Sequence, residues 1–131
     1  MGYKIDKILA EISAGELFDK ITILEIKKAK ISNKEKLNDI EKELLSLNET
    51  VKKYIPNQSS ISKYVNDLRN INLKLWDIED GKRDAEKNKD FGEKFIELAR
   101  NVYKFNDERA KIKLAINNSL GSNIKEVKSY K

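Results

Sequence analysis

The sequence predicts an all-α fold, an antiparallel bundle of about four helices. Two observations on composition favour helices over a sheet. The 131-residue chain has one proline and five glycines, and charged residues make up 37% of it, whereas a sheet protein needs many turns. The third observation is the helical spacing of apolar residues in four successive stretches. A chain of this length buries one core, so residues 1–131 are expected to form a single domain.

The first expected helix begins at Ser13. Ser13 and Glu16 form a capping-box pattern, in which each side chain bonds a backbone N–H at the helix start. The helix is expected to end at about Ile31, and apolar residues fall on several of its sides, which indicates a central position among several neighbours. Residues 1–12 are a lead-in segment, whose apolar spacing fits either a short helix or an extended path.

The second expected helix follows almost at once. Ser32 and Glu35 repeat the capping-box pattern, so the connection is very short and favours an antiparallel hairpin. Pro56 is expected to end the helix. Its apolar residues alternate as in a coiled-coil seam. They are Leu37, Ile40, Leu44, Leu47, Val51 and Tyr54. Such a seam packs within the chain or against a second copy, and a homodimer is expected.

The third expected helix is long and follows a short polar loop at 56–60. It is expected over residues 61–88. Gly81 weakens it by about 1 kcal/mol relative to alanine, and permits a kink or a close approach to a neighbour.

A third capping pattern, Asp90 with Glu93, precedes the fourth expected helix. This helix is expected over residues 91–120, and Gly121 is placed as its C-terminal stop. The polar tail at 122–131 is expected to be mobile.

Composition excludes several kinds of site. The chain has no cysteine and no histidine, which removes disulfides, thiolate metal sites, the commonest general base and the usual zinc ligand. The net charge of +5 comes from lysines spread over every segment, so nucleic-acid binding is not indicated. No apolar run approaches the ~20 residues of a membrane span, and no signal peptide is present, so a cytoplasmic protein is expected.

Four chemically distinctive residues border the apolar stripe of the third helix when it is projected at ~100° per residue. They are Asn72, Trp76, Glu79 and Arg83. Glu79 and Arg83 are four residues apart, which is close enough for an ion pair. Asp80 is a further carboxylate in this stretch.

On the fourth helix, Arg109 lies within the apolar stripe, and Asn106 and Lys113 lie along one edge of it. An unpaired buried charge is very costly, so Arg109 requires a carboxylate or a bound anion. One interpretation is structural, with Glu79 or Asp80 paired to Arg109 across the two helices.

The other interpretation is a polar pocket between helices. Arg83, Arg109 and Lys113 would receive an anionic group such as a phosphate. The two asparagines would give directional hydrogen bonds, and Trp76 a flat apolar wall. On the first helix, Glu25 is the carboxylate expected to partner an arginine.

The leading functional hypothesis is a non-catalytic binding or accessory module that accepts a phosphorylated small ligand, with no cofactor indicated. The alternative is an enzyme that acts on a nucleotide or sugar phosphate through carboxylate-bound magnesium. Its candidate ligands are Asp77, Glu79, Asp80 and Asp107. That alternative requires two or more of these carboxylates to converge on one point.

Several long stretches carry a resemblance to a known family. They lie at residues 12–26 (ISAGELFDKITILEI), 72–80 (NLKLWDIED), 90–103 (DFGEKFIELARNVY), 106–109 (NDER) and 126–130 (EVKSY). Together they resemble a family of small bacterial and phage proteins of unknown function, often encoded near surface-polysaccharide genes. Ala14 stands where this family usually has proline.

The resemblance implies no known activity. Its motif residues coincide with the candidates found by spacing on the third and fourth helices. It also includes Glu16, Asp19, Lys20 and Glu25, which implies that the first helix belongs to the same neighbourhood.

Overall fold

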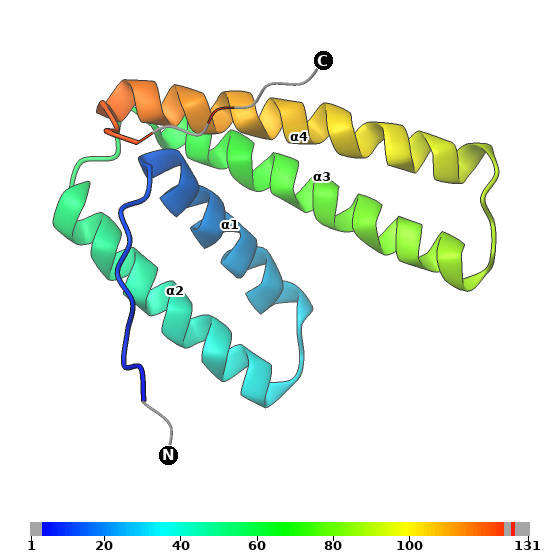
Figure 1. Cartoon of the computed structure of the whole chain (residues 1–131), viewed down its shortest axis with the longest axis horizontal. Helices are drawn as coiled ribbons and strands as arrows, with labels where there is room; N and C mark the ends of the chain where they lie inside the picture. Colours follow the sequence, from blue (N-terminus) through cyan, green and yellow to red (C-terminus); the bar gives the residue numbers. More distant parts are fainter. Residues whose placement is uncertain (1–3, 125–126, 128–131) are drawn as a thin grey trace.

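The computed structural model describes residues 4–124 and 127 of the chain, and these contain four helices. They are α1 (Ala14–Lys30), α2 (Lys34–Tyr54), α3 (Ser62–Lys87) and α4 (Glu93–Leu120). No strand occurs among the described residues, so the all-α prediction is confirmed. Figure 1 shows two hairpins, α1–α2 and α3–α4, with α3–α4 extending well beyond the region that α1–α2 covers.

The helix α1 is the centre of the fold, because it packs against each of the other three helices. Its apolar side chains are buried on several sides, as the sequence predicts. They are Leu17, Phe18, Ile21, Leu24 and Ile26. On the opposing helices, Leu68, Ile71 and Ile116 complete the core around them.

The start of α1 is tied to the end of α4. Ser13 Oγ accepts a hydrogen bond from the Glu16 N–H at 3.1 Å, which is one half of the predicted capping box. The other half is wrong, because the Glu16 carboxylate pairs with Lys113 and not with the Ser13 N–H. The Gly15 N–H donates to Asn117 Oδ1 at 2.6 Å, and the Ala14 N–H donates to Ser122 Oγ at 2.8 Å. These three bonds satisfy donors that a helix start leaves unpaired, so α1 is anchored at its N-terminus by residues 102 or more positions later in the chain.

Gly15 permits this close approach. A Cβ atom at Gly15 would lie 2.5 Å from the carbonyl oxygen of Lys113 and 3.0 Å from Asn117 Oδ1. A backbone carbonyl cannot move aside as a side chain can, so a larger residue would separate α1 from α4.

Two predicted helix caps are wrong. Asn33, not Ser32, caps α2, and its Oδ1 accepts from the Lys36 N–H at 3.0 Å. Gly92 is the N-cap of α4, and Asp90 accepts from the Gly92 N–H instead of capping the helix. Neighbouring Ser, Asn and Asp residues cap almost equally well, so sequence alone does not select among them. Gly121 does end α4 with a left-handed φ of 64°, as predicted.

The lead-in segment takes the extended alternative. Residues 4–13 form no helix, and Ile8 and Leu9 are 79% and 83% exposed. A short amphipathic stretch has little intrinsic helical stability without packing, so helical spacing alone does not fold it. Of the tail predicted to be mobile, Ser122–Asn123 bond to Asn117 and Glu11. The remainder, apart from Ile124 and Val127, lies outside the described residues.

The seam of α2 packs within the chain. Ile40 and Val51 are buried, and Leu44 and Leu47 lie half-buried against the core. Tyr54, predicted as the last seam residue, is exposed instead, because it lies in the final turn of α2 just before Pro56.

Candidate functional site

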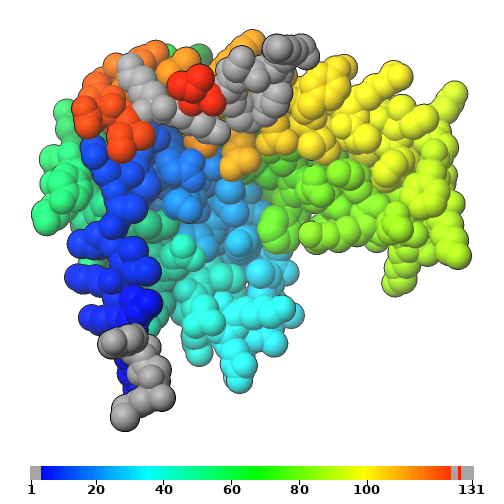
Figure 2. All heavy atoms as spheres, viewed as in Figure 1, coloured from blue at the N-terminus to red at the C-terminus, as the bar shows by residue number. Residues whose placement is uncertain are grey.

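A groove lies in the angle where the two hairpins diverge. The α1–α2 hairpin leaves α3–α4 uncovered beyond this point, and Figure 2 shows the recess between the two masses. The groove encloses about 490 Å³. Helix α1 contributes Ile23, Ile26 and Lys27 to its lining. A volume of this size is within the range of small-molecule sites.

Most residues singled out by helical projection line this groove. From α3 and α4 they are Asn72, Trp76, Glu79, Asp80, Arg83, Asn106 and Arg109. Trp76 is half-buried, whereas Asp80 and Arg83 are exposed. The prediction that one edge of α3 faces Asn106 and Arg109 across an inter-helix space therefore agrees with the geometry.

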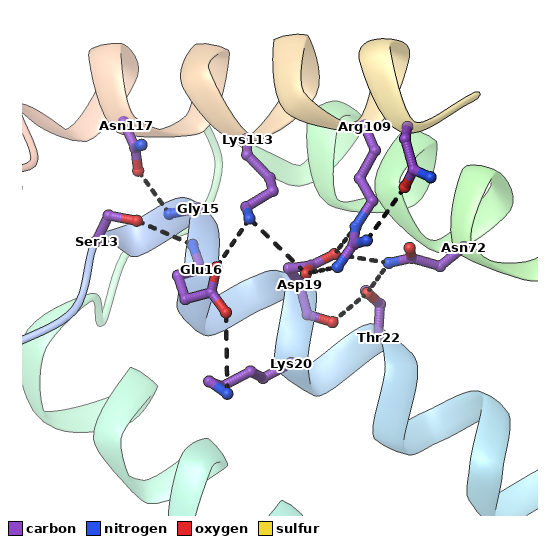
Figure 3. Close-up of polar contacts among 11 residues, drawn as sticks. Ser13, Gly15, Glu16, Asp19, Lys20, Thr22, Asn72, Arg109, Lys113 and Asn117 are labelled. Atoms are coloured by element: carbon purple, nitrogen blue, oxygen red, sulfur yellow. Dashed lines mark hydrogen bonds and ion pairs between the residues drawn. The ribbon is translucent and has the colours of Figure 1, made fainter. Parts of the chain in front are cut away.

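The wall of the groove is held by one buried carboxylate, Asp19, which is 1% exposed. Figure 3 shows Asp19 on α1 pointing toward α3 and α4. Arg109 Nε donates to Asp19 Oδ1 at 2.8 Å, and a terminal nitrogen of Arg109 donates to Oδ2. Asn72 Nδ2 donates to Asp19 Oδ1 and to Thr22 Oγ1, both at 2.9 Å. These four residues are called the Asp19 network below.

Arg109 therefore has a carboxylate partner, as its position in an apolar stripe requires, but the predicted partner is wrong. Neither Glu79 nor Asp80 pairs with it. Glu79 pairs with Lys82 at 3.6 Å, and not with Arg83 as predicted, since both the i+3 and the i+4 positions are within reach on a helix. The helix α1 packs against both α3 and α4, so its Asp19 reaches Arg109 from the core side.

Lys113 lies outside the groove. Its Nζ donates to Glu16 Oε2 at 2.8 Å and lies 3.9 Å from Asp19 Oδ2. Figure 3 shows Lys113 pointing at the first turn of α1. The predicted placement of Lys113 beside Arg83 is therefore wrong, because α1 occupies the space toward which Lys113 extends. Lys20 also lies near Glu16, at 3.8 Å.

Glu25 does pair with an arginine, as predicted. Arg69 donates to its two carboxylate oxygens at 3.2 and 3.4 Å. Both side chains are about 39% exposed, and neither lines the groove, so this pair lies apart from the candidate site.

The network keeps Asp19 ionised. Burial alone raises the pKa of this carboxyl, but hydrogen bonds from Arg109 and Asn72, together with the positive charges of Arg109 and Lys113, outweigh it and hold the pKa below its ordinary value of 3.8. Arg109 and Asn72 both line the groove, and their hydrogen bonds to the ionised Asp19 fix the positions of their polar groups.

The projection of the third and fourth helices did not identify Asp19 and Thr22, which lie on the first helix and bond to Asn72 and Arg109. The signal lies on the first helix: Asp19, Thr22, Ile23 and Ile26 are spaced i, i+3, i+4 and i+7, which is one helical face. A polar residue on a face that packs against two helices is a candidate for a buried hydrogen-bonded pair.

Two of the four carboxylates proposed for magnesium, Glu79 and Asp80, line the groove. Within residues 4–124 and at 127, no group of three or more acidic, histidine or cysteine side chains is arranged to hold a metal ion. Asp77 and Asp107 are exposed and are not part of the groove lining. In the same part of the chain, no helix has the length and apolar character needed to cross a membrane.

Comparison with known proteins gives a family and no activity. No curated protein and no solved structure matches the chain. A family model described as "Family of unknown function (DUF6165)" matches residues 8–131, nearly the whole chain. This agrees with the resemblance carried by the motifs of α1, α3 and α4. The chain therefore belongs to the family of unknown function DUF6165.

Proposed function

We propose that the chain is a non-catalytic binding module whose groove takes up a small ligand with an anionic group such as a phosphate. The observation that carries the proposal is that a groove of about 490 Å³ is lined by polar side chains, Asn72 and Arg109, which a buried carboxylate holds in position. Ligand sites in proteins combine a mostly apolar cleft with a few well-positioned polar groups.

Charge in the groove supports an anionic ligand. The lining contains Lys27, Arg83 and Arg109 against Glu79 and Asp80. Asp19 balances Arg109, and Lys82 balances Glu79. Among the described residues, neither Lys27 nor Arg83 forms an ion pair, so these two cations outnumber the remaining carboxylate of Asp80. The planar guanidinium of Arg83 suits two-point contact with a phosphate.

Apolar and hydrogen-bonding surfaces lie beside these charges. Trp76 offers a flat apolar surface, and Ile23 and Ile26 of α1 also line the groove. Asn106 Oδ1 accepts from Arg109 at 3.4 Å, which leaves its amide NH₂ as a donor group on the lining. A ligand with a ring and an anionic group matches this pairing of surfaces.

A binding role is proposed over catalysis because the most buried polar groups of the site, those of Asp19, Asn72 and Arg109, are hydrogen-bonded to one another. The chain also has no histidine or cysteine, the side chains that most often serve as base or nucleophile.

Thermal unfolding in the presence of inorganic phosphate, sugar phosphates and nucleotides tests the proposal. A ligand at ~100 times its Kd stabilises the folded state by about 2.7 kcal/mol, which raises Tm by several degrees. The proposal fails if none of these compounds raises Tm.

A further inference from the structure

The outer face of α4 carries an apolar stripe that no other helix covers. Ile96, Tyr103 and Leu114 are 46%, 58% and 43% exposed. Their spacings of seven and eleven residues keep all three within ~20° of one line along the helix. Figure 1 shows α4 at the edge of the fold, with no helix on its side away from α3. A helix facing water on this side needs only polar residues there.

Two opposite charges lie within the same stripe. Arg100 and Asp107 are exposed and fall within ~40° of the line through Ile96. They are seven residues apart, about 10.5 Å along the axis, which is too far for a pair within their own helix. Neither forms an ion pair with any residue in the described part of the chain.

We propose that this face is the interface of a symmetric homodimer, in which α4 packs antiparallel against α4 of a second copy. A two-fold axis on the outer face, at the level of residue 105 along α4, places Ile96 opposite Leu114 of the second copy, and Tyr103 opposite Asp107. It also brings Arg100 within one helical turn of Asp107 of the second copy. The same contacts recur on the other side of the axis, as a two-fold interface requires.

The charge pattern favours a second copy over an unrelated partner. One face that carries both charges between two apolar ends is complementary to itself when reversed. Ile96 and Leu114 lie at the two ends of the stripe and the charges between them, so the antiparallel register matches Ile96 with Leu114 and brings each Arg100 near Asp107 of the other copy. A contact through one helix pair is small, so a dimer of modest affinity is expected. The inference is independent of the groove, since none of these stripe residues lines it.

Sedimentation equilibrium of the full chain at up to ~100 μM tests the interface. We expect a monomer–dimer equilibrium. Arg100→Asp places two acidic pairs in the interface and Asp107→Arg two basic pairs, so each variant alone is expected to dissociate at least tenfold more readily. An equimolar mixture of the two variants restores both opposite-charge pairs, and is expected to form a heterodimer.

A matched control separates this face from general surface effects. Leu45 on α2 is an exposed leucine outside the stripe, so Leu45→Glu is expected to leave the equilibrium unchanged, whereas Ile96→Glu is expected to abolish the dimer. A wild-type chain that stays monomeric overturns the proposal. So does a dimer that Ile96→Glu leaves intact, or a mixture of the charge variants that fails to associate.

Discussion

Asp19 of α1 and Arg109 of α4 are joined by two side-by-side hydrogen bonds, one from Nε at 2.8 Å and one from a terminal nitrogen. Asp19 is fully buried, and Arg109 is 28% exposed at its side chain. The pair therefore connects the core to the lining of the groove. Two-point contact fixes the orientation of the guanidinium as well as its position, so the shape of the groove depends on the charge of Asp19.

Asp19→Asn is expected to destabilise the fold by about 3 kcal/mol. The substitution keeps the size of the side chain but leaves Arg109 and the buried Lys113 without their shared carboxylate, and breaking a buried pair costs about 3–5 kcal/mol. Urea unfolding measures the change.

The matched control for that change is Glu25→Gln, which removes the carboxylate of the half-exposed pair with Arg69. Exposed ion pairs contribute up to about 1 kcal/mol, so a small loss is expected. Equal losses for the two variants contradict the central role of Asp19.

Acid is expected to weaken the contribution of Asp19. Its pKa lies lower in the folded chain than its ordinary value of 3.8, so on acidification the unfolded chain takes up this proton first. The stabilisation is therefore complete above the unfolded pKa, and is lost as pH falls toward and through the folded pKa. The difference in free energy of unfolding between wild type and Asp19→Asn is expected to shrink as pH falls from about 5 to about 2. A difference that stays constant over this range is the contrary result.

Gly15→Ala is expected to destabilise, although alanine is the better helix former by about 1 kcal/mol. The new Cβ would lie 2.5 Å from the Lys113 carbonyl oxygen, and overpacking costs about 1–3 kcal/mol. At Gly81 the nearest atom is instead the Leu98 side chain at 3.2 Å, which can shift. Gly81→Ala is therefore expected to be close to neutral. The Tm of each variant, measured by thermal unfolding, checks both expectations. A stabilised Gly15→Ala variant contradicts the close approach of α1 and α4.

The helices and much of the groove followed from the sequence because both depend on local spacing. Apolar residues three and four apart predict a helix and its buried side without knowledge of neighbours, and the same projection placed Asn72, Trp76 and Arg83 on one edge. The end of α4 at Gly121 and the end of α1 near Ile31 were predicted correctly from residues within one helical turn of each end.

The partners across helices did not follow, because they depend on how α1 enters between α3 and α4. Arg109 clearly needed a carboxylate, and Glu79 or Asp80 was expected to supply it. Asp19 is the actual partner, and its approach to Arg109 depends on the crossing of α1 with α4. Lys113 was misplaced for the same reason, since its side chain follows the start of α1. The cap of α2 depends on a choice between adjacent Ser32 and Asn33 that differs by little free energy.

The central claim, that the groove binds an anionic small ligand, is tested most directly by the fluorescence of Trp76. This is the single tryptophan of the chain, and it lines the groove. Titration with sugar phosphates and nucleotides is expected to give a saturable change for at least one of them. Arg83→Gln is expected to weaken that ligand about tenfold, or 1.4 kcal/mol. Lys63→Gln, the same charge change at an exposed position of α3 that lies off the lining, is expected to weaken it no more than about twofold. No saturable change in the wild type, or an equal loss in both variants, contradicts the claim.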